Sequence, residues 1–183
     1  MDNNDIEVDD LFGGDENPKK KVNGKRKGNR VELELCKKLS EHFGDTFSRA
    51  VGSGNRWGQV SFMPTHAKKT LVGDICVPEG FKWVIECKGG YDDDVDFSSA
   101  FEGCTRIDEF IKQSKKDAEL SERMPIVFWK RSRKPWIAML RGCDFTLPGL
   151  GCYLKYNDWI VLSLDNLLEN TTKDYWYDTG SSK

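Results

Sequence analysis

Residues 71–88 constrain the fold of this chain more than any other stretch. Two runs rich in apolar and β-branched side chains, residues 71–77 and 81–88, flank the turn sequence Pro78-Glu79-Gly80. This pattern predicts an antiparallel hairpin. Side chains alternate between faces along a strand. The second run therefore places one set of side chains, Val84, Glu86 and Lys88, on one face, and another set, Trp83, Ile85 and Cys87, on the opposite face.

Charged side chains inside these apolar runs are unusual. A turn near Glu79 folds Asp74 back beside Glu86, on the face that also carries Lys88. Charged groups rarely lie in a partly buried sheet unless they are paired or bind a metal. The hairpin therefore predicts a divalent-metal site that hydrolyses phosphodiesters. The alternative is a buried network of lysine and carboxylates with a structural role only.

A helix is expected from Gly28 to about Phe43. At about 100° per residue, its apolar side chains form one stripe, which also contains Glu32 but not Glu34. Glu32 is thus a carboxylate aimed at the core, and Glu34 an ordinary solvated one. The alternative for Glu32 is an acid of the first helical turn, stabilised by the helix dipole. The apolar stripe consists of Leu35, Cys36, Leu39 and Phe43.

Length and composition are those of one globular domain. The chain has 183 residues, of which 38% are apolar and 32% charged, so it can bury a single core. We expect an arm at 1–24, one domain at 25–172 and a tail at 173–183. The chain shows no apolar run of about 18 residues, so no membrane span is predicted. The six cysteines form no CxxC pair, which favours reduced thiols and a cytoplasmic protein.

The net charge of −2 conceals a strongly polarised N-terminus. Residues 1–18 carry seven acids and no base, and residues 19–30 carry seven bases and no acid. The basic half could lie along a phosphate backbone. The alternative is a disordered, solubilising arm.

The remaining elements follow from hydrophobic periodicity. The expected strands are 45–51, 126–129, 135–140 and 159–162, and the expected helices are 105–122 and 163–169. Strands 126–129 and 135–140 form a second hairpin with a basic tip. Candidate phosphate contacts lie on this tip, in and near the Gly/Ser loop 52–58, and at the start of the first helix. They are Lys25, Arg26, Lys27, Arg30, Arg49, Arg56, Lys68, Lys69, Arg131 and Arg133.

Metal-assisted phosphodiester hydrolysis accounts for the charged set on the hairpin. Mg²⁺ takes a few carboxylate or carbonyl oxygens and keeps several waters. Asp74 and Glu86 are the expected direct ligands, with the main-chain carbonyl of Cys87 as a further one. Lys88 would orient the attacking water or stabilise the transition state, and Glu32 would add an indirect or second-metal ligand.

The series Gly28-x-x-x-Glu32, Arg49, Ser53, Gly73-Asp74 and Glu86-Cys87-Lys88 resembles the PD-(D/E)XK nuclease superfamily. Within it, the basic segment before Val31-Glu32 and the Gly/Ser loop after Arg49 are similar to the archaeal-type Holliday-junction resolvases and their viral relatives. The resemblance covers about residues 25–140. In this chain Gly73 stands where the family usually has proline.

The resemblance implies an α/β fold with an αβββαβ core, in which helices flank a central mixed sheet. It also implies catalytic roles for Glu32, Ser53, Asp74, Glu86 and Lys88, and Mg²⁺ as cofactor with Mn²⁺ as a substitute. The expected partner is branched or duplex DNA. The expected activity is the resolution of four-way junctions by a homodimer that makes paired nicks. Two alternatives stay open: a nuclease acting on linear duplex or flaps, and a catalytically silent DNA-binding module.

Overall fold

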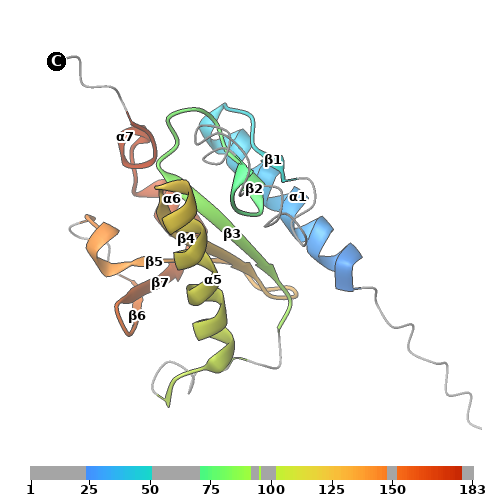
Figure 1. Cartoon of the computed structure of the whole chain (residues 1–183), viewed down its shortest axis with the longest axis vertical. Coiled ribbons are helices and arrows are strands. Elements are labelled where there is room, and N and C mark those ends of the chain that lie inside the picture. The colour runs from blue at the N-terminus through green and yellow to red at the C-terminus, as the bar shows by residue number, and fades with distance from the viewer. Residues whose placement is uncertain (1–23, 51–70, 92–94, 96–101, 148–151, 179–183) are drawn as a thin grey trace, which may run out of the picture.

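The computed structural model describes residues 24–50, 71–91, 95, 102–147 and 152–178. The first six elements among the described residues follow the expected αβββαβ order (Figure 1). These are α1 (Gly24–Phe43), β1 (Ser48–Arg49), β2 (Ile75–Cys76), β3 (Trp83–Gly89), α5 (Thr105–Ser121) and β4 (Met124–Lys130). After them come β5 (Trp136–Arg141), the 3₁₀ turn η1 (Gly142–Asp144), β6 (Leu154–Tyr156), β7 (Trp159–Ser163), α6 (Leu164–Glu169) and α7 (Lys173–Trp176).

The central sheet has five strands in the order β3-β4-β5-β7-β6. Strands β3 and β4 are parallel and the other neighbours are antiparallel, so the sheet is mixed as expected. Parallel neighbours need a crossover connection, and α5 provides it between β3 and β4. In this strand order, β3 lies at one edge of the sheet.

Helices α1 and α5 cover opposite faces of this sheet. On β4, Ile126 and Phe128 belong to the cluster that packs against α1, whereas Val127 and Trp129 belong to the cluster that packs against α5. The register pairs Glu86 of β3 with Val127. Because faces alternate along a strand, Glu86 and Lys88 lie on the α5 face, and Ile85 and Cys87 lie on the α1 face.

The hairpin expected at residues 71–88 is only partly regular. Strand β2 is limited to Ile75–Cys76, and it pairs with β1 in a separate two-stranded sheet. The Asp74 N–H donates to the Ile85 carbonyl over 2.9 Å, but the Cys87 N–H donates to the Asp74 carboxylate instead of a backbone carbonyl. A side chain thus replaces a ladder bond, and the expected strand 71–77 was too long.

The packed body continues past residue 172, where we expected the tail to begin. The indole of Trp176 is fully buried and stacks on Phe81, with ring centroids 5.9 Å apart. The Lys82 N–H donates to the Trp176 carbonyl over 2.8 Å. These contacts tie α7 to the start of β3. The aromatic cluster thereby anchors the same strand that carries Glu86.

Two further expectations concern the whole chain. All six cysteines are free thiols, in agreement with the sequence. Among the described residues, no helix is both long and apolar enough to cross a membrane.

Candidate active site

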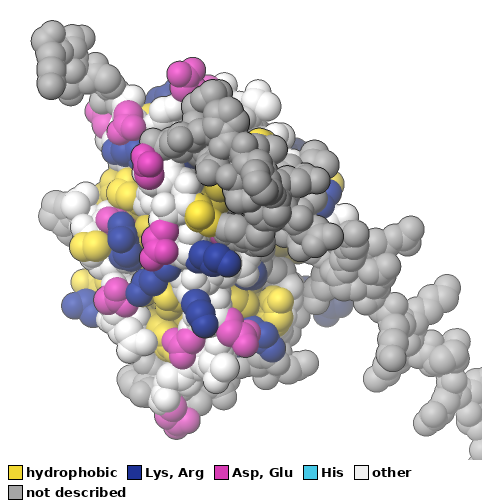
Figure 2. All heavy atoms as spheres, in the orientation of Figure 1, with side chains coloured by type: hydrophobic (Ala, Val, Ile, Leu, Met, Phe, Trp, Pro, Cys, Tyr) yellow, Lys and Arg dark blue, Asp and Glu magenta, His cyan; other side chains and the backbone are white. Residues whose placement is uncertain are grey.

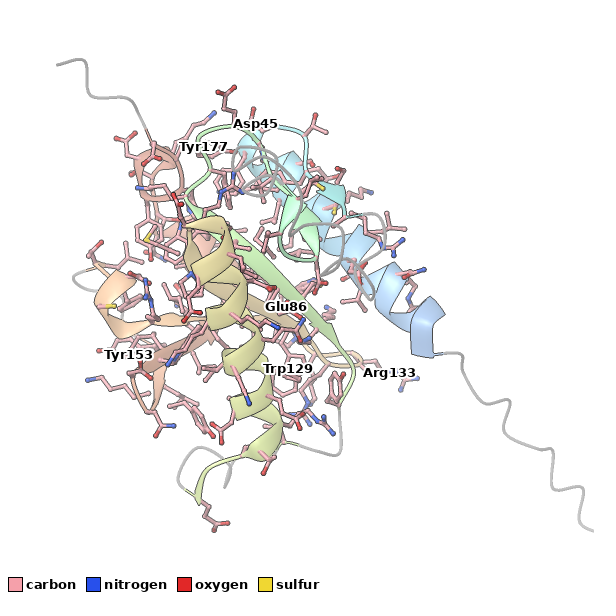
Figure 3. All side chains as sticks on the ribbon, viewed as in Figure 1. Asp45, Glu86, Trp129, Arg133, Tyr153 and Tyr177 are labelled. Carbon is pink, nitrogen blue, oxygen red and sulfur yellow. The ribbon has the colours of Figure 1, made fainter. Side chains whose placement is uncertain are left out.

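Asp74 and Glu86 meet at the edge strand β3, as the sequence predicts. Both are buried, with 9% and 1% of their surface exposed. The Asp74 Oδ2 atom accepts the Cys87 N–H over 2.9 Å, which fixes this carboxylate beside the strand. The Lys88 ammonium donates to Glu86 Oε1. Figure 3 shows Glu86 on β3, behind α5.

Asp74 and Glu86 lie close together in a buried environment, and both have raised pKa values. Burial and, to a smaller extent, the neighbouring Glu86 charge raise the pKa of Asp74 to about 8, although the Cys87 N–H and Lys88 lower it. Burial also raises the pKa of Glu86, although Lys88 opposes this shift. For Lys88, burial alone would lower the pKa, but Glu86 and Asp74 outweigh burial and raise it. Lys88 is therefore a firmly held cation.

Helix α5 adds two residues that the sequence interpretation missed. Gln113 accepts a hydrogen bond from Lys88 Nζ over 2.8 Å, so the ammonium is held from both β3 and α5. Asp117 is buried, with 5% of its surface exposed, and its pKa is raised by burial. The interaction of Asp117 with Glu86 enters the pKa shifts of both carboxyl groups. The signal was present in the sequence, because Asp117 lies three residues after Ser114 on the inward stripe.

Glu32 faces inward, as the helical phase predicts. It is 8% exposed, whereas the Glu34 side chain is 48% exposed and lies 3.7 Å from Lys130 Nζ. The carboxylate of Glu32 is paired with the Arg49 guanidinium of β1. Helix α1 covers the face of β3 opposite to Glu86, and Glu32 lies with Arg49 and near Cys87.

The Asp74 and Glu86 pair fits a divalent cation of the kind that keeps much of its water. Glu86 Oε2 is buried and has no hydrogen-bond partner, which leaves an oxygen available to a ligand. Mg²⁺ is commonly bound through one or two carboxylates together with substrate phosphates. Within the described part of the chain, no three acidic, thiol or imidazole side chains are grouped as ready metal ligands.

The candidate phosphate contacts are only partly within the described residues. Ser53, Arg56, Lys68 and Lys69 lie outside them. Lys25, Arg26 and Lys27 fall in the first turn of α1, and Arg30 is exposed on the same helix.

Of the three remaining candidates, Arg49 pairs with Glu32, and the other two lie at the tip of the β4–β5 hairpin. Arg133 is exposed there, and the Arg131 guanidinium lies 5.6 Å from the Trp129 ring centre. Figure 3 shows this tip beyond the end of β3, on the side where α1 begins. Over the α5 face, Lys and Arg alternate with Asp and Glu (Figure 2). The basic hairpin tip is therefore the stronger described candidate for a phosphate contact.

An αβββαβ core whose edge strand carries Glu-Cys-Lys, with an aspartate held against it, defines a nuclease of the PD-(D/E)XK type. The model of a family described as "Phage putative PDDEXK endonuclease" matches residues 23–177, and the chain belongs to this family. No curated protein and no solved structure matches it. Nucleases of this type typically use divalent metals, and DNA is the substrate implied by an endonuclease family.

Proposed function

We propose that this protein is a Mg²⁺-dependent DNA endonuclease whose catalytic group is Asp74, Glu86 and Lys88. The observation that carries the proposal is the burial of two adjacent carboxylates beside one lysine on an edge strand. Buried like charges are costly unless a cation compensates them. Mn²⁺ is expected to substitute for Mg²⁺, since both accept oxygen ligands.

Each residue of the group has a distinct task. Asp74 and Glu86 would hold the cation, which supplies charge stabilisation at the phosphate and a more acidic water. The Cys87 N–H fixes the Asp74 carboxylate, and the main-chain carbonyl of Cys87 is a further candidate ligand. Lys88, held by Glu86 and Gln113, would stabilise negative charge on the phosphate as water adds and the sugar oxygen leaves.

The substrate we propose is a four-way DNA junction, cut symmetrically by a homodimer. The support is the motif series from Glu32 and Arg49 through the Gly/Ser loop containing Ser53 to the Glu86-Cys87-Lys88 triplet. Arg49 pairs with Glu32 in the free protein, so it would reach a phosphate only by exchanging this partner. The basic residues of α1 and of the β4–β5 tip are proposed to contact the phosphate backbone.

A substrate panel tests this proposal. End-labelled four-way junction, flap and linear duplex of the same sequence are incubated with the full chain and Mg²⁺, or with EDTA. We expect paired, symmetric nicks in the junction that disappear in EDTA and with Asp74→Asn. Equal cutting of linear duplex would refute junction selectivity but not the nuclease. Binding without cutting in Mg²⁺ and in Mn²⁺ would refute the catalytic proposal and leave a DNA-binding module.

A further inference from the structure

Asp117 is a buried acid that the proposed catalytic group does not use. It lies on the face of α5 that packs on the sheet, with Ile107, Phe110 and Ser114. Its side-chain hydrogen-bond partner is Glu86, which is itself an acid. A carboxylate buried beside other carboxylates is destabilising unless a proton or a cation compensates it, because burial removes its hydration. Its position therefore requires a compensating group.

Two unsatisfied oxygen atoms belong to the same interface. Glu86 Oε2 and Ser114 Oγ are both buried without a hydrogen-bond partner, and Ser114 precedes Asp117 by less than one helical turn. The Glu86 side chain is 1% exposed and interacts with both Asp74 and Asp117. Two ionised carboxylates cannot donate hydrogen bonds to each other, so Glu86 Oε2 needs an external donor or a cation.

The charges in this group are not balanced by the protein. Asp74, Glu86 and Asp117 are three acids, and Lys88 is the ammonium that pairs directly with one of them. If all three acids are ionised, the group has two negative charges in excess, which one divalent cation would neutralise. The three acids are nevertheless not grouped as direct ligands around one point.

We infer that Asp117 is an outer-sphere carboxylate of the cation site, which accepts hydrogen bonds from waters bound to a divalent cation held by Asp74 and Glu86. The inference rests on the proposed function, because it takes Asp74 and Glu86 as the direct ligands. Mg²⁺ keeps several waters, and their protons need acceptors. Such outer-shell partners commonly change metal affinity by about 10- to 100-fold. Asp117 of α5 thus adds an acid to the site beside Asp74 and Glu86, and Glu32 of α1 pairs with Arg49.

Calorimetric titration of the metal-free full chain with MnCl₂ tests the inference. Asp117→Asn keeps the shape of the side chain and removes its charge, and Glu119→Gln removes an exposed charge from the same helix as a control. We expect Asp117→Asn to weaken Mn²⁺ binding by about 10- to 100-fold. We expect Glu119→Gln to bind like the wild type, and Asp117→Glu to recover part of the affinity.

Thermal unfolding in EDTA separates this role from a structural one. Removing a charge that is buried beside other acids should leave the metal-free Tm of Asp117→Asn unchanged or higher, while its Mn²⁺ affinity falls. A lower metal-free Tm with unchanged Mn²⁺ affinity would overturn the inference and make Asp117 structural. Wild-type affinity in Asp117→Asn, together with lost affinity in Asp74→Asn, would overturn it and leave the proposed function intact. No Mn²⁺ binding by the wild type would overturn both.

Discussion

Gly73 allows the close approach that places Asp74 against β3, and replacing it with alanine tests this directly. Gly73 has φ +93°, which L-residues rarely adopt, and an added Cβ would lie 2.8 Å from the Ile85 carbonyl oxygen. The left-handed backbone costs about 1–2 kcal/mol. The overlap with a strand carbonyl adds about 1–3 kcal/mol, because that backbone is held in the sheet. We therefore expect Gly73→Ala to lower the free energy of unfolding by about 2–5 kcal/mol.

Gly44 provides a matched control for this substitution. It has φ +69°, and an added Cβ would meet nothing within 4 Å, so Gly44→Ala carries only the backbone term. Urea unfolding in EDTA measures both variants, and the effect of alanine on the unfolded chain is common to them. Gly73→Ala should be the less stable by about 1–3 kcal/mol. Equal losses in the two variants would refute the view that Ile85 restricts this position.

Three further predictions concern the site. Glu32→Gln should lower the free energy of unfolding in urea by about 2 kcal/mol, because it weakens a largely buried charged hydrogen bond to Arg49. It should also abolish cleavage if Glu32 is an indirect metal ligand, as the family resemblance implies. Glu34→Gln should be nearly silent in both assays, and equal effects would contradict the helical phase. Gln113→Leu should reduce kcat about tenfold without changing Mn²⁺ affinity, because Lys88 loses one acceptor; an unchanged kcat would refute this positioning role. In EDTA, the raised pKa of Asp74 contributes stability that is fully present below pH 3.8 and is lost as the pH rises to about 8. The Tm of the wild type should therefore fall across this pH window more steeply than the Tm of Asp74→Asn. Parallel curves would contradict the raised pKa.

The sequence predicted the fold well because the periodicities of its core elements are strong. The stripe of α1 and the alternation along β3 are local properties, so the burial of Glu32 and Glu86 could be predicted. The length of β2 could not, because it depends on the Asp74 carboxylate taking the Cys87 N–H from a backbone acceptor. That bond joins residues far apart in sequence and has no signature in composition.

The sequence interpretation missed Asp117 as an acid beside Glu86. Sequence phase alone showed that Glu32 points inward, but not which face of the sheet α1 would cover. The structure places α1 opposite to Glu86 and places α5 over it, so Asp117 lies with Glu86. The departure at Gly73 also has a physical reason. Proline fixes φ near −65° and could not adopt the φ of +93° that this turn requires.

The most direct test of the central claim is the Mg²⁺ dependence of DNA cleavage by the wild type and by Asp74→Asn. Both proteins are titrated with MgCl₂ on labelled junction DNA under single-turnover conditions, after their binding to the same DNA in EDTA has been shown to be equal. The wild type should cleave with a saturable Mg²⁺ dependence, and Asp74→Asn should not cleave at any concentration. Cleavage by Asp74→Asn at the wild-type rate, or wild-type cleavage that persists in EDTA, would contradict the assignment of Asp74 and Glu86 as the cation site.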